Sequence, residues 1–136
     1  MKKFLYLLPA AFLLLSLAGY GLVQGEEVDY KASYEKQMKE NTSTMETING
    51  VVAWLKEHHY EKYPNAKDAV DDALDSLNNA EVAKKKAEDF AAKANWKQAS
   101  GWSTQYWQYL VKVATEGLRA KKMVEDAEAE AAPAEK

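Results

Sequence analysis

The sequence predicts an all-α fold, a small antiparallel three-helix bundle, from its composition, its periodicity and its turn signals. The chain of 136 residues contains only three prolines and six glycines, and Ala, Lys and Glu dominate after residue 26, which is a composition typical of helices. Apolar residues recur every three or four positions over long stretches, as one face of a helix requires. Short connections near Pro64 and Asn95 then force neighbouring helices to run antiparallel. A four-helix bundle is the alternative if residues 27–40 form a helix of their own.

The first 25 residues are predicted to be either a signal peptide or a single transmembrane anchor helix. Lys2 and Lys3 precede an uncharged stretch of 20 residues, 4–23, and acidic residues follow from Glu26 onwards. Because positive charge stays on the cytoplasmic side, the rest of the chain is expected in the bacterial periplasm or on the outer face of the inner membrane. Residues 23–25 offer a small-residue cleavage site before Glu26, whereas an apolar stretch of about 20 residues can also stay in the bilayer as a helix. Both alternatives remain open, and a retained anchor would leave the N-terminus in the cytoplasm.

The chain lacks cysteine and carries a negative net charge, and each feature excludes classes of function. Without a thiol there can be no disulfide, thiolate-bound metal, covalently attached haem or cysteine nucleophile. Tyr20 stands where a lipoprotein would carry its lipidated cysteine, so lipid attachment is not expected. The chain after residue 25 holds 16 basic and 21 acidic residues, a net charge of −5, because the only charged residues of the first 25 are two lysines. A nucleic acid is therefore not an expected partner, since phosphate binding needs a clustered basic face.

Turn and capping signals divide the chain into its first two bundle helices. Residues 26–42 are polar and are predicted to form a stalk or a short helix. Ser43 followed by Glu46 fits a capping box, so a long helix is predicted to begin there. Pro64 is predicted to end that helix, because the residue before a proline is pushed out of the α region. Asn65 is predicted to cap the next helix.

The second predicted helix carries a seam made mainly of alanine. Its apolar positions between residues 66 and 94 follow steps of four and three, with one slip near Ala80, which is a spacing typical of helix bundles. Asn78 and Asn79 coincide with the slip and mark a point where the helix is expected to kink or break. Small side chains let another helix approach closely but bury little area themselves.

A third long helix is predicted from Trp96 to about Glu128, after a tight turn at Asn95. The bundle domain then covers residues 43–128. The tail over 129–136 is rich in Ala, Glu and Pro and is predicted to be disordered. Six large side chains of the three helices are predicted to be mostly buried: Leu55, Leu77, Phe90, Trp102, Tyr106 and Leu110.

The third helix has a wide apolar face, which allows two interpretations. At 100° per residue its apolar arc covers about 200°, whereas a surface helix that packs on one partner needs about half of that. In the first interpretation the helix is central and contacts two other helices of its own bundle. In the second, part of the arc stays open for a partner protein. The side chains predicted to remain uncovered and to bind that partner are Trp54, Trp107, Val111 and Leu118.

The two histidines and the acidic cluster that follows them are weak candidates for metal ligands. His58 and Glu61 have a workable helical spacing, but two ligands do not make a site. His58 is therefore expected to be solvated and His59 to lie at the edge of the core. Asp68 and Asp72 belong to a group of four carboxylates at the start of a helix, where acidic groups favour the positive end of the helix dipole. A weak divalent-cation site is the alternative, although no calcium-loop spacing supports it.

The sequence indicates binding rather than catalysis. It contains no Ser/His/Asp ordering, Gly-rich phosphate loop or paired carboxylates in an apolar setting, so no enzyme is expected and no cofactor is implied. We expect a structural or accessory subunit of a bacterial membrane or envelope complex, docked on other protein subunits through its aromatic-rich helix. Residues 4–23 would add contact with the membrane if they are not cleaved. The alternative is a soluble periplasmic helical carrier that binds a divalent metal or a small ligand.

Overall fold

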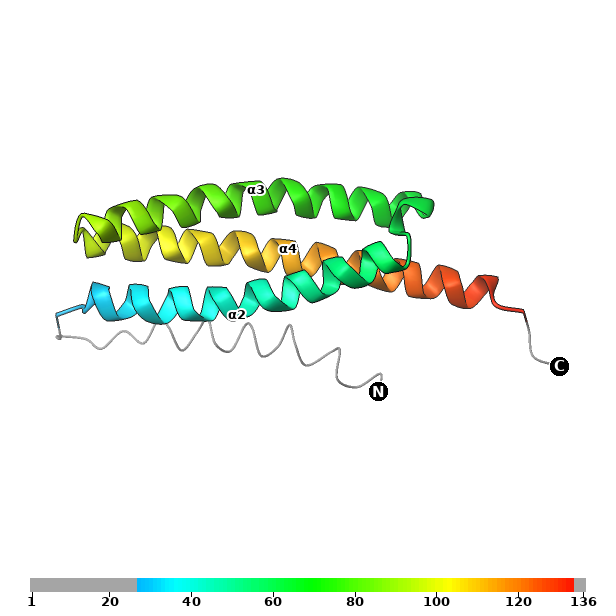
Figure 1. Ribbon diagram of the computed structural model, residues 1–136, viewed down its shortest axis with the longest axis horizontal. Helices are drawn as coiled ribbons and strands as arrows, with labels where there is room; N and C mark the ends of the chain where they lie inside the picture. Colours follow the sequence, from blue (N-terminus) through cyan, green and yellow to red (C-terminus); the bar gives the residue numbers. More distant parts are fainter. Residues whose placement is uncertain (1–26, 134–136) are drawn as a thin grey trace.

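Three α-helices account for nearly all of residues 27–133, which are the residues that the computed structural model describes (Figure 1). They are α2 (Tyr30–Glu57), α3 (Pro64–Ala92) and α4 (Trp96–Ala131), and a 3-10 turn, η1 (Tyr60–Lys62), joins α2 to α3. No strand occurs among these residues, so the predicted all-α fold with three helices is confirmed, and a separate helix over 27–40 is not observed. No helix within this described range is long and apolar enough to cross a membrane. The signal peptide or anchor predicted for residues 1–25 lies outside the described residues.

The first helix begins at Tyr30, well before the predicted start at Ser43. The Asp29 carboxylate accepts a hydrogen bond of 3.0 Å from a backbone N–H of the first turn, which satisfies one of the free donors at the helix end. Ser43 and Glu46 lie exposed within α2. Their capping-box pattern therefore does not mark the start of a helix. The sequence predicts a stalk or a short helix over residues 26–42. From Tyr30 onwards this segment forms the first half of α2.

Between α2 and α3, the first helix ends earlier than predicted and the second begins at a different residue than predicted. α2 stops at Glu57, and His59 adopts a left-handed backbone with φ of 50° before η1. Pro64 is the first residue of α3, where its fixed φ suits a helix and its missing N–H costs no hydrogen bond. The prediction of Asn65 as the cap is therefore wrong, because Asn65 already lies inside the first turn.

α3 is one continuous helix through residues 78–79, so the predicted break is not observed. The turn that follows matches the prediction. Ala94 adopts a left-handed backbone with φ of 54°, and the Asn95 side chain accepts a 3.3 Å hydrogen bond from a backbone N–H of the first turn of α4. α4 continues to Ala131, so the tail predicted to be disordered over 129–136 is helical in its first residues.

The three helices form an open bundle in which α4 is central. α2 and α3 both pack on α4 and touch each other only marginally, and Figure 1 shows α4 running between them. α3 is antiparallel to its two neighbours, as the short connections predict, so α2 and α4 run in the same direction. Because α2 and α3 do not close on each other, the bundle has a groove between them with α4 as its floor.

Two apolar clusters form the core along α4. The first contains Ile48, Ala73, Ala80, Ala83, Tyr106, Leu110 and Val113. The second, nearer to η1, contains Leu55, Ala66, Ala69, Val70, Ala120 and Val124. Alanines supply most of the α3 side, so the predicted alanine seam is buried against α4 and lets the two backbones approach closely.

Half of the six predicted core side chains are fully buried. These are Leu55, Tyr106 and Leu110, which are 2%, 3% and 0% exposed. The other three are only half-buried: Leu77, Phe90 and Trp102. Alanines occupy most of the buried positions of α3, and its larger side chains Leu77 and Phe90 are only partly covered.

A buried amide connects α2 to α4. Asn41 is 0% exposed, and its Nδ2 donates a 3.1 Å hydrogen bond to the backbone carbonyl of Ser103. Its Oδ1 accepts a 3.3 Å hydrogen bond from Gln37 Nε2. Because a buried amide needs its partners, this contact holds α2 in one register on α4.

Candidate functional site

Three of the four tryptophans are engaged with cationic or aromatic neighbours. Trp54 stacks on the His58 ring at a centroid distance of 3.8 Å, and Lys121 Nζ lies 5.0 Å from its ring centroid. Lys86 Nζ lies 4.2 Å from the ring centroid of Trp102. The ring of Trp96 has two such neighbours, Tyr34 at 5.9 Å and Lys31 Nζ at 5.4 Å. Cations above indole faces are attracted by the ring quadrupole, so these three rings have partners within the domain.

Trp107 is the exception, and it belongs to an apolar stripe on α4. We call Trp107, Val111 and Leu118 the α4 stripe, because at 100° per residue they lie within about 40° of one another around the helix. All three are half-buried. None belongs to either core cluster or to the apolar side chains packed against the clusters, and Trp107 has no ring or cation contact within residues 27–133.

The α4 stripe lies beside α2 and away from α3. Trp102, which contacts α3 through Lys86, is about 140° from Trp107 around the helix. Lys121, which contacts α2 through Trp54, is only about 60° from Leu118. Trp54, the fourth residue of the predicted docking surface, therefore borders the stripe from α2, although its ring is already packed against His58 and the second core cluster.

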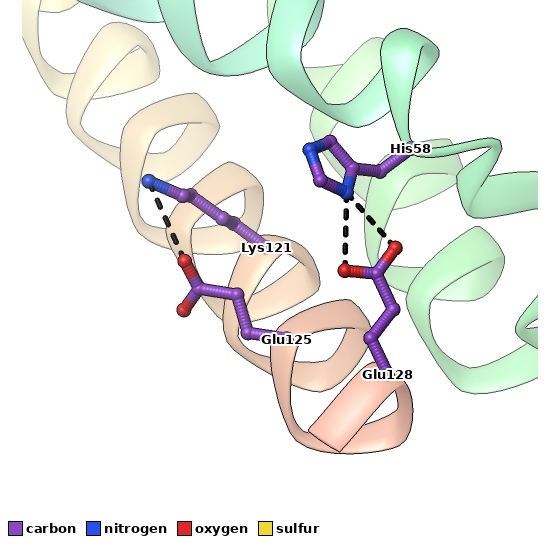
Figure 2. Close-up of polar contacts among 4 residues, drawn as sticks. All are labelled: His58, Lys121, Glu125 and Glu128. Carbon is purple, nitrogen blue, oxygen red and sulfur yellow. Dashed lines mark hydrogen bonds and ion pairs between the residues drawn. The ribbon is translucent and has the colours of Figure 1, made fainter. Parts of the chain in front are cut away.

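A polar cluster ties the end of α2 to the last turns of α4 (Figure 2). His58 Nδ1 lies 2.9 Å and 3.1 Å from the two carboxylate oxygens of Glu128. On the neighbouring turn of α4, Lys121 Nζ lies 3.6 Å from Glu125 Oε1. The expectation that His58 is solvated is wrong, and so is the expectation that His59 lies at the core edge, since His59 is exposed. The helix ends at Glu57, so the helical geometry used to place both histidines does not extend to them.

The candidate metal ligands are spread over different surfaces. Glu61 is exposed on η1, and Asp68 and Asp72 are exposed on α3. His58 pairs with Glu128. Within the described residues no group of three or more His, Asp or Glu side chains is arranged to hold a metal ion.

The groove between α2 and α3 forms an apolar cavity of about 200 Å³. Thirteen residues line it: Ile48, Val51, Val52, Leu55, Lys56, Tyr60, Val70, Ala73, Leu74, Leu77, Val113, Ala114 and Gly117. Leu74, on the rim, is 44% exposed. Sequence reasoning missed this groove, because its width depends on how far apart α2 and α3 settle on α4. The only local signal was Leu74, a large apolar side chain that stands outside the seam of α3.

Two tyrosines, Tyr106 in the first core cluster and Tyr34 on α2, have raised pKa values. Burial, and then the negative charges of Glu81 and Glu88, raise the pKa of Tyr106 to about 12. Burial and Glu88 also raise the pKa of Tyr34. Both phenols are therefore neutral near pH 7 and act only as hydrogen-bonding groups.

Comparison with known proteins adds no relative from which a function could be carried over. No protein-family model, curated protein or solved structure matches this chain.

Proposed function

We propose that the chain is a non-catalytic structural or accessory subunit that docks on another protein subunit through the α4 stripe, with Trp54 at its border. One observation supports the proposal most directly. Trp107 is a large aromatic side chain that is only half-buried, outside both core clusters, and without a ring or cation partner in residues 27–133. Val111 and Leu118 extend the same apolar surface along the helix.

Energetics favour a docking role for such a stripe. Tryptophan is enriched among the few interface residues that carry most of the binding energy, and such anchors lie in apolar surroundings rimmed by polar groups. On α4 the rim is supplied by neighbouring polar side chains such as Gln108 and Thr115, which are exposed. Burying the stripe against a partner would remove apolar area from water at about 25 cal/mol per Å².

The proposed location follows from the charges around residues 4–23. With Lys2 and Lys3 before this segment, the helical domain belongs on the outer side of a bacterial inner membrane or in the periplasm. The partner is then a subunit of a membrane or envelope complex.

The test is photo-crosslinking in the native host. A benzoylphenylalanine placed at position 107 is expected to capture one protein reproducibly, and one placed at Val82 is expected to capture none. Val82 is the matched control because it is a 55% exposed apolar residue on α3, outside the stripe. Trp107→Ala with Leu118→Ala should abolish that capture from position 111 while the melting temperature changes little.

Two results would reject the docking function. One is equal capture from positions 107 and 82. The other is a double variant that unfolds while the native chain behaves as a monomer without a crosslinked partner, since the stripe would then serve only the stability of the domain.

A carrier of a small apolar ligand is the second candidate, and one observation favours it. The groove between α2 and α3 is a cavity of ligand size with an apolar lining, as small-molecule sites usually have. The metal-carrier version has no comparable support among residues 27–133. Titration with divalent metals checks it, because tight stoichiometric binding would restore it.

A further inference from the structure

The groove has the shape of a site for an apolar chain. Ile48 and Val52 line it from α2, Leu77 lines it from α3, and Val113 and Gly117 form part of its floor on α4. Its cavity of about 200 Å³ exceeds the roughly 150 Å³ of an engineered apolar cavity that stays dry and binds benzene. From Ile48 to Lys56 on α2 it extends over about 12 Å of helix. An elongated, single aliphatic chain fits these dimensions better than a bulky ligand.

One end of the groove carries a cation. Lys56 is the single charged side chain among the residues that line it, and Tyr60 lines the same end. Lys56 is exposed and forms no ion pair with another residue of the described part of the chain. Its ammonium offers three donors on a flexible stem, and the Tyr60 hydroxyl can add another. This end therefore suits an anionic head group that stays near water.

We infer that the groove binds one aliphatic carboxylate of the fatty-acid class, with its alkyl chain between α2 and α3 and its carboxylate at Lys56 and Tyr60. The cavity accommodates one chain, so a lipid with two acyl chains does not fit. This site is independent of the proposed docking function, because the α4 stripe lies on the other side of α2.

The experiment uses the full chain in phosphatidylcholine vesicles, which avoids competition from detergent, and decanoate with a diazirine on its alkyl chain as the probe. Photolysis and peptide mass spectrometry are expected to give saturable adducts on Val52 and Leu77. Leu74→Glu should reduce this labelling roughly ten-fold or more, because it places a charge in an apolar site. Val82→Glu should leave it unchanged, since Val82 is also an exposed apolar residue of α3 (55%, against 44% for Leu74) but does not line the groove.

The head-group contact is tested separately. Lys56→Gln should weaken decanoate binding by roughly two- to five-fold, as expected for an exposed ion pair, and Lys56→Arg should retain it. Neither change should affect decanol, which has no charge. Any of three results overturns the assignment. They are labelling that fails to saturate, labelling that falls equally in Leu74→Glu and Val82→Glu, and labelling that is absent from the residues that line the groove. Equal loss of decanol and decanoate in Lys56→Gln overturns it as well. The Trp107→Ala, Leu118→Ala double variant should still bind decanoate, so failure of the docking proposal can be told apart from failure of this one.

Discussion

Replacing Asn41 with alanine tests whether a single buried amide fixes the position of α2 on α4. Asn41 is 0% exposed and donates to the Ser103 carbonyl at 3.1 Å, which is a hydrogen bond between the two helices. It also accepts from Gln37 at 3.3 Å. Because α2 contacts α3 only marginally, its position depends on such contacts with α4.

The expected loss of stability combines three terms. The interhelical hydrogen bond contributes a net of about 1 kcal/mol, and truncating a buried side chain costs roughly another 1–2 kcal/mol through lost packing. Alanine returns up to about 0.6 kcal/mol through its better helix propensity. The free energy of unfolding should therefore fall by about 1.5–3 kcal/mol. At roughly 4–8 °C per kcal/mol for a domain of this size, the melting temperature should fall by about 6–24 °C.

The assay is thermal unfolding of the full chain followed by circular dichroism, with Thr42→Ala as the control. Thr42 neighbours Asn41 on the same helix but is exposed, and its hydroxyl donates only to the Met38 carbonyl of its own helix. The control keeps the gain in helix propensity without removing an interhelical contact. Equal melting temperatures for the two variants would refute the conclusion that this amide fixes the register.

Further predictions concern the core and its titration. Leu110→Ala should lower the free energy of unfolding in urea by about 2–5 kcal/mol, because Leu110 is 0% exposed. Leu77→Ala should cost clearly less, since Leu77 is half-buried at the groove; an equal cost would contradict the placement of Leu77 at the edge. The pKa of Tyr106 is raised from 10.0 to about 12 by burial, Glu81 and Glu88, so the folded state favours the neutral phenol. This preference for the neutral phenol stabilises the folded state fully below pH 10. The stabilisation, on the order of 2 kcal/mol, is lost as the pH rises from 10 to 12. Tyr106→Phe should remove that part of the alkaline loss of stability, and superimposable pH profiles for the two proteins would contradict this.

Local signals predicted the helices better than they predicted where the helices begin. Asn95 was identifiable because an amide that accepts from the first turn suits a helix start, and nothing nearby competes with it. At Ser43 the capping box was misleading, since the same residue types are tolerated on the exposed face of a helix. The start at Tyr30 depends on Asp29, an equally valid cap. Choosing between two valid caps requires knowing that α2 continues to pack on α4 as far back as Tyr34, which is tertiary information.

The candidate surfaces were predictable only in part, for a related reason. Periodicity could identify Trp107 and Leu118 as part of an apolar arc too wide to be covered by one neighbouring helix, because the width of the arc depends only on the sequence of that helix. It could not place His58 against Glu128, which lies 70 residues away and only 2.9 Å from the imidazole. Nor could it show that Trp54 would be occupied by stacking on His58. Contacts between helices depend on their separation and rotation, which the pattern of one helix does not contain.

The geometry around α4 shows why this domain has two apolar surfaces rather than one. Trp102 faces α3 and Lys121 faces α2, and the two positions are about 100° apart around the helix. The apolar arc of about 200° is wider than that. Part of it, with Val113 and Gly117, lies between the two neighbouring helices as the floor of the groove, and the part with Trp107 lies beyond α2. If α2 moved toward α3, the groove would become narrower but more of the α4 stripe would be exposed. If α2 moved away from α3, the stripe would be covered but the groove would become wider. The small alanine side chains of α3 cannot fill the groove in either case, so covering both surfaces together requires groups from outside these three helices.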